Sequence, residues 1–168
     1  MLSNTVNLVF AGGFTFLVVL AVVSDARQLV IPNWISLALV GAFAAFAAVV
    51  TPTPPVLAHI GVALAVFAVG ALLFVVRWFA AGDVKLLTAV ALWAGPSASL
   101  WLVTLTTLLG ALLAIGVLGA RWLDNYGEAI GMPSGLRRLL PRWARHGLCP
   151  YGVAIGAAAL LTVPAQML

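Results

Sequence analysis

Long apolar runs alternate with short polar or proline- and glycine-bearing stretches along the chain from Leu8 onward. Continuously apolar runs are typical of helices that cross a membrane, because in lipid a helix satisfies its own backbone hydrogen bonds. The pattern predicts an all-α membrane protein with six membrane-spanning helices, at residues 5–23, 35–50, 56–76, 84–97, 99–120 and 151–167. The second and fourth are short for a hydrocarbon core about 30 Å thick.

The first apolar run is predicted to remain in the protein as a helix. A signal peptide would begin with basic residues and end at a small-residue cleavage site, whereas this run has no basic start and is followed by Asp25 and Arg27. Composition agrees with a membrane protein, since 64% of the residues are hydrophobic and 7% are charged; a soluble domain has about a quarter charged. Without internal repeats or low-complexity segments, we expect a single domain over residues 1–168.

The eight basic residues all fall on alternate linkers between the predicted spans. They are Arg27, Arg77, Lys85, Arg121, Arg137, Arg138, Arg142 and Arg145. Because basic residues mark cytoplasmic loops, we expect these linkers in the cytoplasm and both termini on the other side. The longest linker, about 121–150, mixes arginine with tryptophan and leucine, which favours a segment held near anionic headgroups over a substrate-docking loop. Because cytoplasmic loops account for the basic residues, the net charge of +4 does not indicate a nucleic-acid partner.

The four acidic residues divide into two pairs. Asp124 and Glu128 lie in the basic loop, where pairing with arginines is their expected role. Asp25 directly follows the first span and Asp83 opens the fourth, so both are expected at the cytoplasmic edge of the membrane, where a carboxylate is costly. Two carboxyl groups close together share a proton, and such a pair can activate water and protonate a peptide carbonyl.

Other roles for this second pair remain open from the residues alone. Asp83 follows Gly82 and could cap the fourth helix. Asp25 could pair with Arg27 as an interfacial anchor. Both acids could relay protons in a small proton-coupled transporter, although no acid falls in the outer half of the membrane. No residue pattern resembles a metal-ligand cluster.

Three stretches resemble, in the same order, the motifs of type IV prepilin peptidases, a family of GxGD-type membrane aspartyl proteases. They are SDARQLVIPNWISL after the first span, AAGDVKLL at the start of the fourth and CPYGVAIGAAAL at the start of the last. The resemblance implies that Asp25 and Asp83 are the catalytic pair and that no cofactor is needed. The residues that would support the site or contact the substrate are Gly82, Lys85, Arg27, Pro32 and Asn33.

The resemblance also implies a substrate and a location. The substrate would be a prepilin or pseudopilin, whose leader peptide lies in the cytoplasm ahead of an apolar helix. Cleavage would take place at the cytoplasmic boundary of the bacterial inner membrane. Membrane lipids surround such an enzyme, and the pilus-assembly machinery is a candidate partner.

Two departures from the family pattern stand out. Ala80 replaces the first glycine of the GxGD motif, and this replacement is expected to alter the shape of the loop. It would also be compatible with a non-enzymatic scaffold protein. The long members carry paired cysteines in a cytoplasmic insertion and methylate their product, whereas Cys149 is the single cysteine here. The chain therefore resembles the short, peptidase-only form associated with tight-adherence (Flp-type) pili. Cys149 itself is expected to be a small apolar side chain near a helix start.

Overall fold

A computed structural model of the chain describes residues 2–50, 53–126 and 149–167, and the regular elements within these ranges are all helices. The helices are α1 (Leu2–Gln28), α2 (Asn33–Val49), α3 (Val56–Val75), α4 (Ala81–Tyr126), α7 (Tyr151–Thr162) and α8 (Pro164–Met167). Among the described residues, three helices are long and apolar enough to cross a membrane, at Asn4–Gln28, Val56–Val75 and Ala81–Tyr126. Shorter apolar helices cover Asn33–Val49 and Tyr151–Gln166. The all-α prediction is confirmed.

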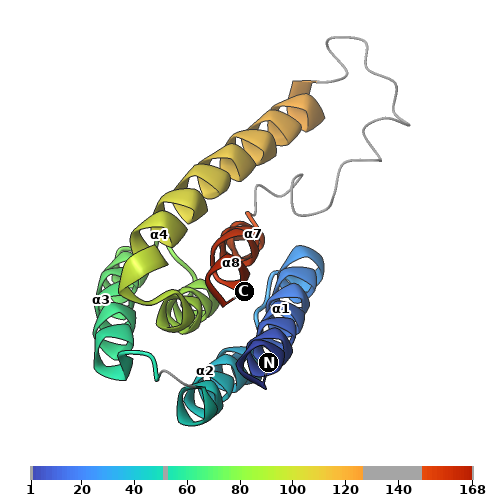
Figure 1. The fold of residues 1–168 in the computed structure, drawn as a ribbon. Helices are drawn as coiled ribbons and strands as arrows, with labels where there is room; N and C mark the ends of the chain where they lie inside the picture. Colours follow the sequence, from blue (N-terminus) through green and yellow to red (C-terminus); the bar gives the residue numbers. More distant parts are fainter. Residues whose placement is uncertain (1, 51–52, 127–148, 168) are drawn as a thin grey trace.

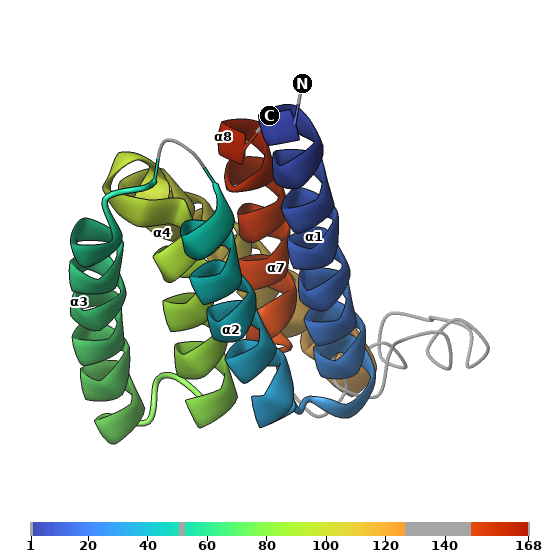
Figure 2. The same cartoon turned by 60° about the horizontal axis from the view of Figure 1, so that its bottom comes forward.

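The helices form a bundle in which α1, α2, α7 and the first part of α4 stand side by side, with α3 against α4 (Figure 2). The two chain termini lie close together in both views (Figures 1 and 2). At the opposite end of the bundle, α1 and α3 end and α2 and α4 begin. The ends of four helices are therefore gathered at the end of the bundle that is away from the termini.

One face of α1 is buried, and this face determines where Asp25 points. Its buried residues Ala11, Phe14, Val18 and Ala21 are spaced alternately by three and four positions, and Asp25 follows four positions later. Residues at this spacing lie on one stripe of a helix. Asp25 therefore continues the apolar stripe of α1 into the bundle instead of facing the surroundings.

An aromatic cluster around Trp93 joins α1, α2 and α4 in the middle of the bundle. The Trp93 ring lies 5.3 Å from Phe14, 5.6 Å from Phe43 and 5.5 Å from Phe46, measured between ring centroids. Its indole N–H donates a hydrogen bond of 2.9 Å to the carbonyl of Leu39. A buried tryptophan needs such a partner for its N–H, so this bond fixes α4 against α2.

The predicted spans 84–97 and 99–120 are the two parts of α4, and they meet at a kink where the sequence predicts the short linker Gly95-Pro96-Ser97. The helix changes direction at Gly95, whose φ of 60° and ψ of −168° are not helical, and Pro96 follows. Its second part runs back diagonally and continues to Tyr126 (Figures 1 and 2). The first residues of the predicted 121–150 loop are therefore helical, and residues 127–148 lie outside the described part.

His59, to which the sequence assigns no role, completes the kink in α4. Pro96 has no backbone N–H, so the Leu92 carbonyl four residues earlier lacks its usual helical donor. The Nδ1 atom of His59 lies 2.8 Å from that carbonyl oxygen, and because the carbonyl can only accept, Nδ1 carries the proton. The imidazole also stacks on Phe43, with 5.3 Å between ring centroids. This contact satisfies a polar group that proline would leave unpaired inside an apolar bundle.

The kink makes a testable prediction about Gly95. An alanine side chain at this position would have to adopt a left-handed backbone conformation and would collide with the His59 ring. We expect Gly95→Ala to lower the free energy of unfolding by about 2 kcal/mol or more, since such strain alone costs about 1–3 kcal/mol. Thermal unfolding in detergent measures this change. Gly116→Ala is the matched control, because its new methyl group meets nothing within 4 Å, and equal stability of the two variants would contradict the role of the kink.

Candidate active site

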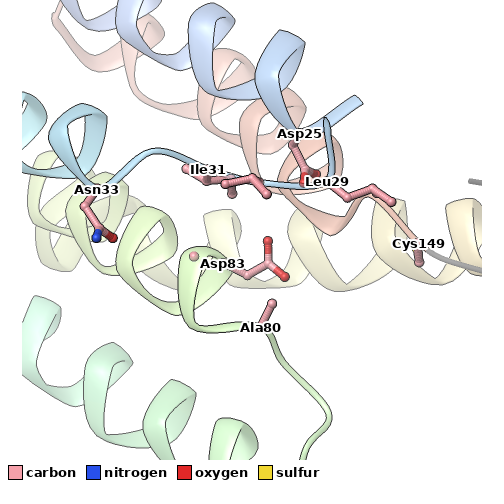
Figure 3. A pocket seen from close by; sticks show the side chains of 9 residues that line it. Asp25, Leu29, Ile31, Asn33, Ala80, Asp83 and Cys149 are labelled. Atoms are coloured by element: carbon pink, nitrogen blue, oxygen red, sulfur yellow. The ribbon is translucent and has the colours of Figure 1, made fainter. Parts of the chain in front are cut away.

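Asp25 and Asp83, which are 58 positions apart, line the same cavity of about 210 Å³ at the end of the bundle away from the termini. Both side chains are buried, with 5% of Asp25 and 8% of Asp83 exposed. Their carboxyl groups point into the cavity from opposite sides, Asp25 from α1 and Asp83 from α4 (Figure 3). The residues that line the cavity are Asp25, Leu29, Val30, Ile31, Asn33, Ala80, Gly82, Asp83 and Cys149.

The start of α7 closes the cavity behind Asp25. The backbone N–H groups of Gly152 and Val153, in the first turn of α7, face the Asp25 carboxyl group. These are helix N-terminal N–H groups without partners inside their own helix, so an acidic side chain complements them. The Oδ2 atom of Asp25 is buried and has no hydrogen-bond partner within the described residues. That oxygen is therefore a buried acceptor next to the start of α7.

The approach of α7 to Asp25 depends on the absence of a side chain at Gly152. A Cβ atom at this position would lie 2.8 Å from Asp25 Oδ2, 3.0 Å from its Cγ and 2.7 Å from Ile31 Cδ1. An added methyl group would therefore have to displace the Asp25 carboxyl group and the end of the Ile31 side chain, or α7 itself. Gly152 thus sets the distance between the last apolar helix and the Asp25 carboxyl group.

Asp83 is the third residue of α4 and not its N-cap, because the helix begins at Ala81. Its carboxyl group faces the backbone N–H of Ala80, the residue that precedes the helix. An acid at the third position that reaches back to the residue before the helix is one half of a capping box. The expected capping role is thus modified: the side chain meets one N–H of the helix start and also lines the cavity.

Of the five residues predicted to support the site, some line the cavity and others lie outside it. Asn33 and Gly82 line the cavity, while Lys85 lies outside its lining and donates a hydrogen bond of 2.9 Å to Asn33 Oδ1. This bond joins the starts of α2 and α4 at the rim of the cavity. Pro32 occupies the position before α2 without lining the cavity. Arg27 is exposed. It lies two positions after Asp25, which corresponds to a rotation of about 200° around the axis of α1, so the two side chains point in different directions.

The connection between α1 and α2 forms one wall of the cavity. Leu29 adopts a φ of 55°, a left-handed conformation that is uncommon for a residue with a side chain. Its N–H donates a hydrogen bond of 2.9 Å to the carbonyl of Asp25, which closes the last turn of α1. The chain then turns so that Ile31 lies against Gly82 at the start of α4. This tight turn keeps the two acid-bearing helix ends next to each other.

Cys149 lines the cavity, a position that the sequence did not predict. The side chain is exposed, and it lies two residues before α7, near a helix start as expected. Partial burial raises the pKa of the Cys149 thiol above its usual value, and the negative charges of Asp83 and Asp25 raise it further. The thiol is therefore protonated at neutral pH. The order Cys-Pro-Tyr-Gly in the sequence is the only signal for this placement, because it ties Cys149 to the start of α7.

The arrangement suits general acid–base chemistry on a bound peptide. Two carboxyl groups face one small cavity, and one of their oxygens has no protein partner within the described chain. One carboxylate can take a proton from water while the other, in its protonated form, donates to a carbonyl oxygen. Among the described residues, no three His, Cys, Asp or Glu side chains form a group that could hold a metal ion.

Gly152→Ala tests the geometry around Asp25. We expect the added methyl group to push Asp25 or α7 out of place and to reduce any reaction at the cavity at least tenfold, while the protein still inserts into the membrane. Reaction rate and the amount of inserted protein are measured together. Gly119→Ala adds the same group where nothing lies within 4 Å and should leave the rate unchanged. A fully active Gly152→Ala protein would show that the close contact has no consequence.

The sequence was compared with known proteins. Residues 12–115, more than half of the chain, match the sequence model of the type IV leader peptidase family. The matched range includes both Asp25 and Asp83. No curated protein and no solved structure matches the chain.

Proposed function

The chain belongs to the type IV leader peptidase family, and we propose that it removes the leader peptide from prepilin-type precursors by aspartyl chemistry at Asp25 and Asp83. The observation that carries this proposal is the meeting of two buried carboxyl groups, from helices far apart in sequence, at one cavity. A carboxyl group inside an apolar bundle is costly and is a functional candidate for that reason. Two at one place are the minimal equipment of an aspartyl protease.

In this mechanism a water molecule lies between the two carboxyl groups. One carboxylate removes a proton from the water as its oxygen attacks the scissile carbonyl carbon, and the protonated partner donates to the carbonyl oxygen. The carboxyl group that took the water proton then gives it to the peptide nitrogen, the other carboxylate takes a proton back from a hydroxyl group of the tetrahedral intermediate, and the C–N bond breaks to release the amine. Asp25 and Asp83 line the same cavity, which supports contact of both carboxyl groups with this water.

The proposed orientation places the cavity at the cytoplasmic face of the bacterial inner membrane. Three basic residues lie at the cavity end of the bundle: Arg27 in the last turn of α1, Arg77 after α3 and Lys85 near the start of α4. Basic residues favour the cytoplasmic side. With the termini at the other end, both would lie outside the cytoplasm (Figure 2). Six crossings follow if α2, both parts of α4 and α7 with α8 each traverse the bilayer.

The remaining assignments belong to the same proposal. Residues 1–168 act as one peptidase domain, with the segment around 121–150 at the membrane surface. Gly82 and Asn33 line the catalytic cavity, and Lys85 holds Asn33 in place. The precursor is a prepilin or pseudopilin, and the short chain with one cysteine favours the tight-adherence (Flp-type) system.

Replacement of either acid tests the proposed chemistry. Asp25→Asn and Asp83→Asn keep the size of the side chain but remove the proton-accepting carboxylate, so each is expected to reduce cleavage of a co-expressed prepilin by at least a thousandfold. Gel mobility of the precursor measures cleavage, and membrane fractionation measures insertion. Asp124→Asn, near the end of α4 and outside the cavity, is the matched control and should cleave normally. Undiminished cleavage by either of the first two variants would refute the dyad.

Reporter fusions test the orientation. Alkaline phosphatase joined after Leu168 should be active, because it folds only outside the cytoplasm, whereas phosphatase joined after Gln28 should be inactive. Enzyme activity normalised to the amount of fusion protein gives the result. The reverse pattern would place the acids at the outer face and would contradict cleavage of a cytoplasmic leader.

A further inference from the structure

A second cavity, much more apolar than the first, adjoins the acid pair. It has a volume of about 420 Å³ and lies between α3, both parts of α4 and the start of α7. Its wall is almost entirely aliphatic and aromatic, including Val66, Val69, Leu87 and Val103. We refer to it as the apolar groove. Unlike the acid-lined cavity, it has no charged residue in its lining.

The apolar groove and the acid-lined cavity are neighbours along the chain at two separate places. Phe79 lines the groove, and the next residue, Ala80, lines the acid-lined cavity. Tyr151 lines the groove, and Cys149, two residues earlier, lines the acid-lined cavity. The Phe79 and Tyr151 rings also contact each other, with centroids 4.8 Å apart. A chain leaving the acids on this side would therefore pass this aromatic pair and enter the groove.

One hydroxyl group in the lining of the groove has no hydrogen-bond partner among the described residues. Thr88, Thr104 and Thr107 each donate their hydroxyl to the carbonyl four residues earlier, at 2.8 Å. Thr106 lines the groove and is only 2% exposed, yet its Oγ1 atom forms no hydrogen bond with the described residues. A buried hydroxyl without a partner costs about 1–3 kcal/mol. Such a group marks a place where a bound molecule can supply the missing acceptor.

We propose that the apolar groove binds the apolar segment of the precursor, on the carboxyl side of the cleaved bond, and that Thr106 donates a hydrogen bond to a backbone carbonyl of that segment. The inference rests on the proposed peptidase function. An apolar peptide segment matches the lining, and its backbone supplies an acceptor that the hydrocarbon chain of a lipid lacks. The groove then gives the enzyme its preference for a leader followed directly by an apolar stretch.

Filling the groove tests the inference. Val69 lines the groove and is 60% exposed, whereas Leu64 on the same helix is 61% exposed and lies outside the groove. The purified full chain is assayed with two peptides that share a leader and cleavage point, one followed by an apolar segment and one by a polar segment. We expect Val69→Trp to raise KM for the apolar peptide at least tenfold with kcat nearly unchanged, and to leave the polar peptide unaffected. Leu64→Trp should change neither.

Removal of the unpaired hydroxyl group is a second test, with KM and thermal stability as its two measurements. A hydroxyl group that served only the fold would lower stability when removed and would not change KM. Thr106→Val is expected to raise KM for the apolar peptide about fivefold while thermal stability stays equal or rises, because an unsatisfied polar group is removed. Thr104→Val, which loses a hydroxyl bonded to its own helix, should leave KM unchanged. A Thr106→Val protein with lowered stability and unchanged KM would show that the hydroxyl serves only the fold.

The two proposals fail in different ways. If the unsubstituted protein cleaves neither peptide, the peptidase function is wrong and the groove inference falls with it. If it cleaves and Val69→Trp affects both peptides equally, or neither, the peptidase function stands and the groove is not a substrate site. Binding of lipid alone in the groove would produce this second outcome.

Discussion

Two carboxyl groups held inside an apolar helical bundle are the constraint on which the rest of this structure depends. Burial of an acid away from water is costly unless polar groups compensate it. Here the compensation comes from helix ends: the first turn of α7 presents N–H groups to Asp25, and the start of α4 presents an N–H to Asp83. Asp25 lies near the end of α1, and only four residues join α1 to α2 at this place. The left-handed turn at Leu29 is therefore part of the same solution.

The end of the bundle away from the acids contains a second constraint, the reversal of α4. There α4 must reverse within a hydrophobic environment, and Gly95 with Pro96 makes the reversal sharp but removes backbone hydrogen bonds. His59 supplies one of them through its contact with Leu92, and the Trp93 ring packs the neighbouring turn. With the first part of α4 buried along most of its length, this fixed reversal orients the helix that carries the acid at its other end.

Sequence reasoning predicted the helical class from apolar runs and placed Asp25 and Asp83 at the same edge through the pattern of basic residues. It placed the break between two helical stretches at Gly95–Pro96, but it did not predict the contact with Leu92 from His59, a residue distant in sequence. It expected Lys85 near the acids, whereas its partner is Asn33. Which nearby acceptor a lysine side chain contacts depends on the positions of the packed helices. Spacing along the sequence does not give these positions.

The position of α7 against Asp25 links the chemistry to the order in which the chain is made. Asp25 enters the membrane with the first helix, and Asp83 joins it when about half of the chain has been synthesised. The N–H groups that complete the surroundings of Asp25 belong to residues 152 and 153, in the last apolar segment. In a nascent chain, the surroundings of Asp25 therefore remain incomplete until that segment has been synthesised and inserted. The full surroundings of Asp25 therefore exist only after the segment with residues 152 and 153 has packed against α1.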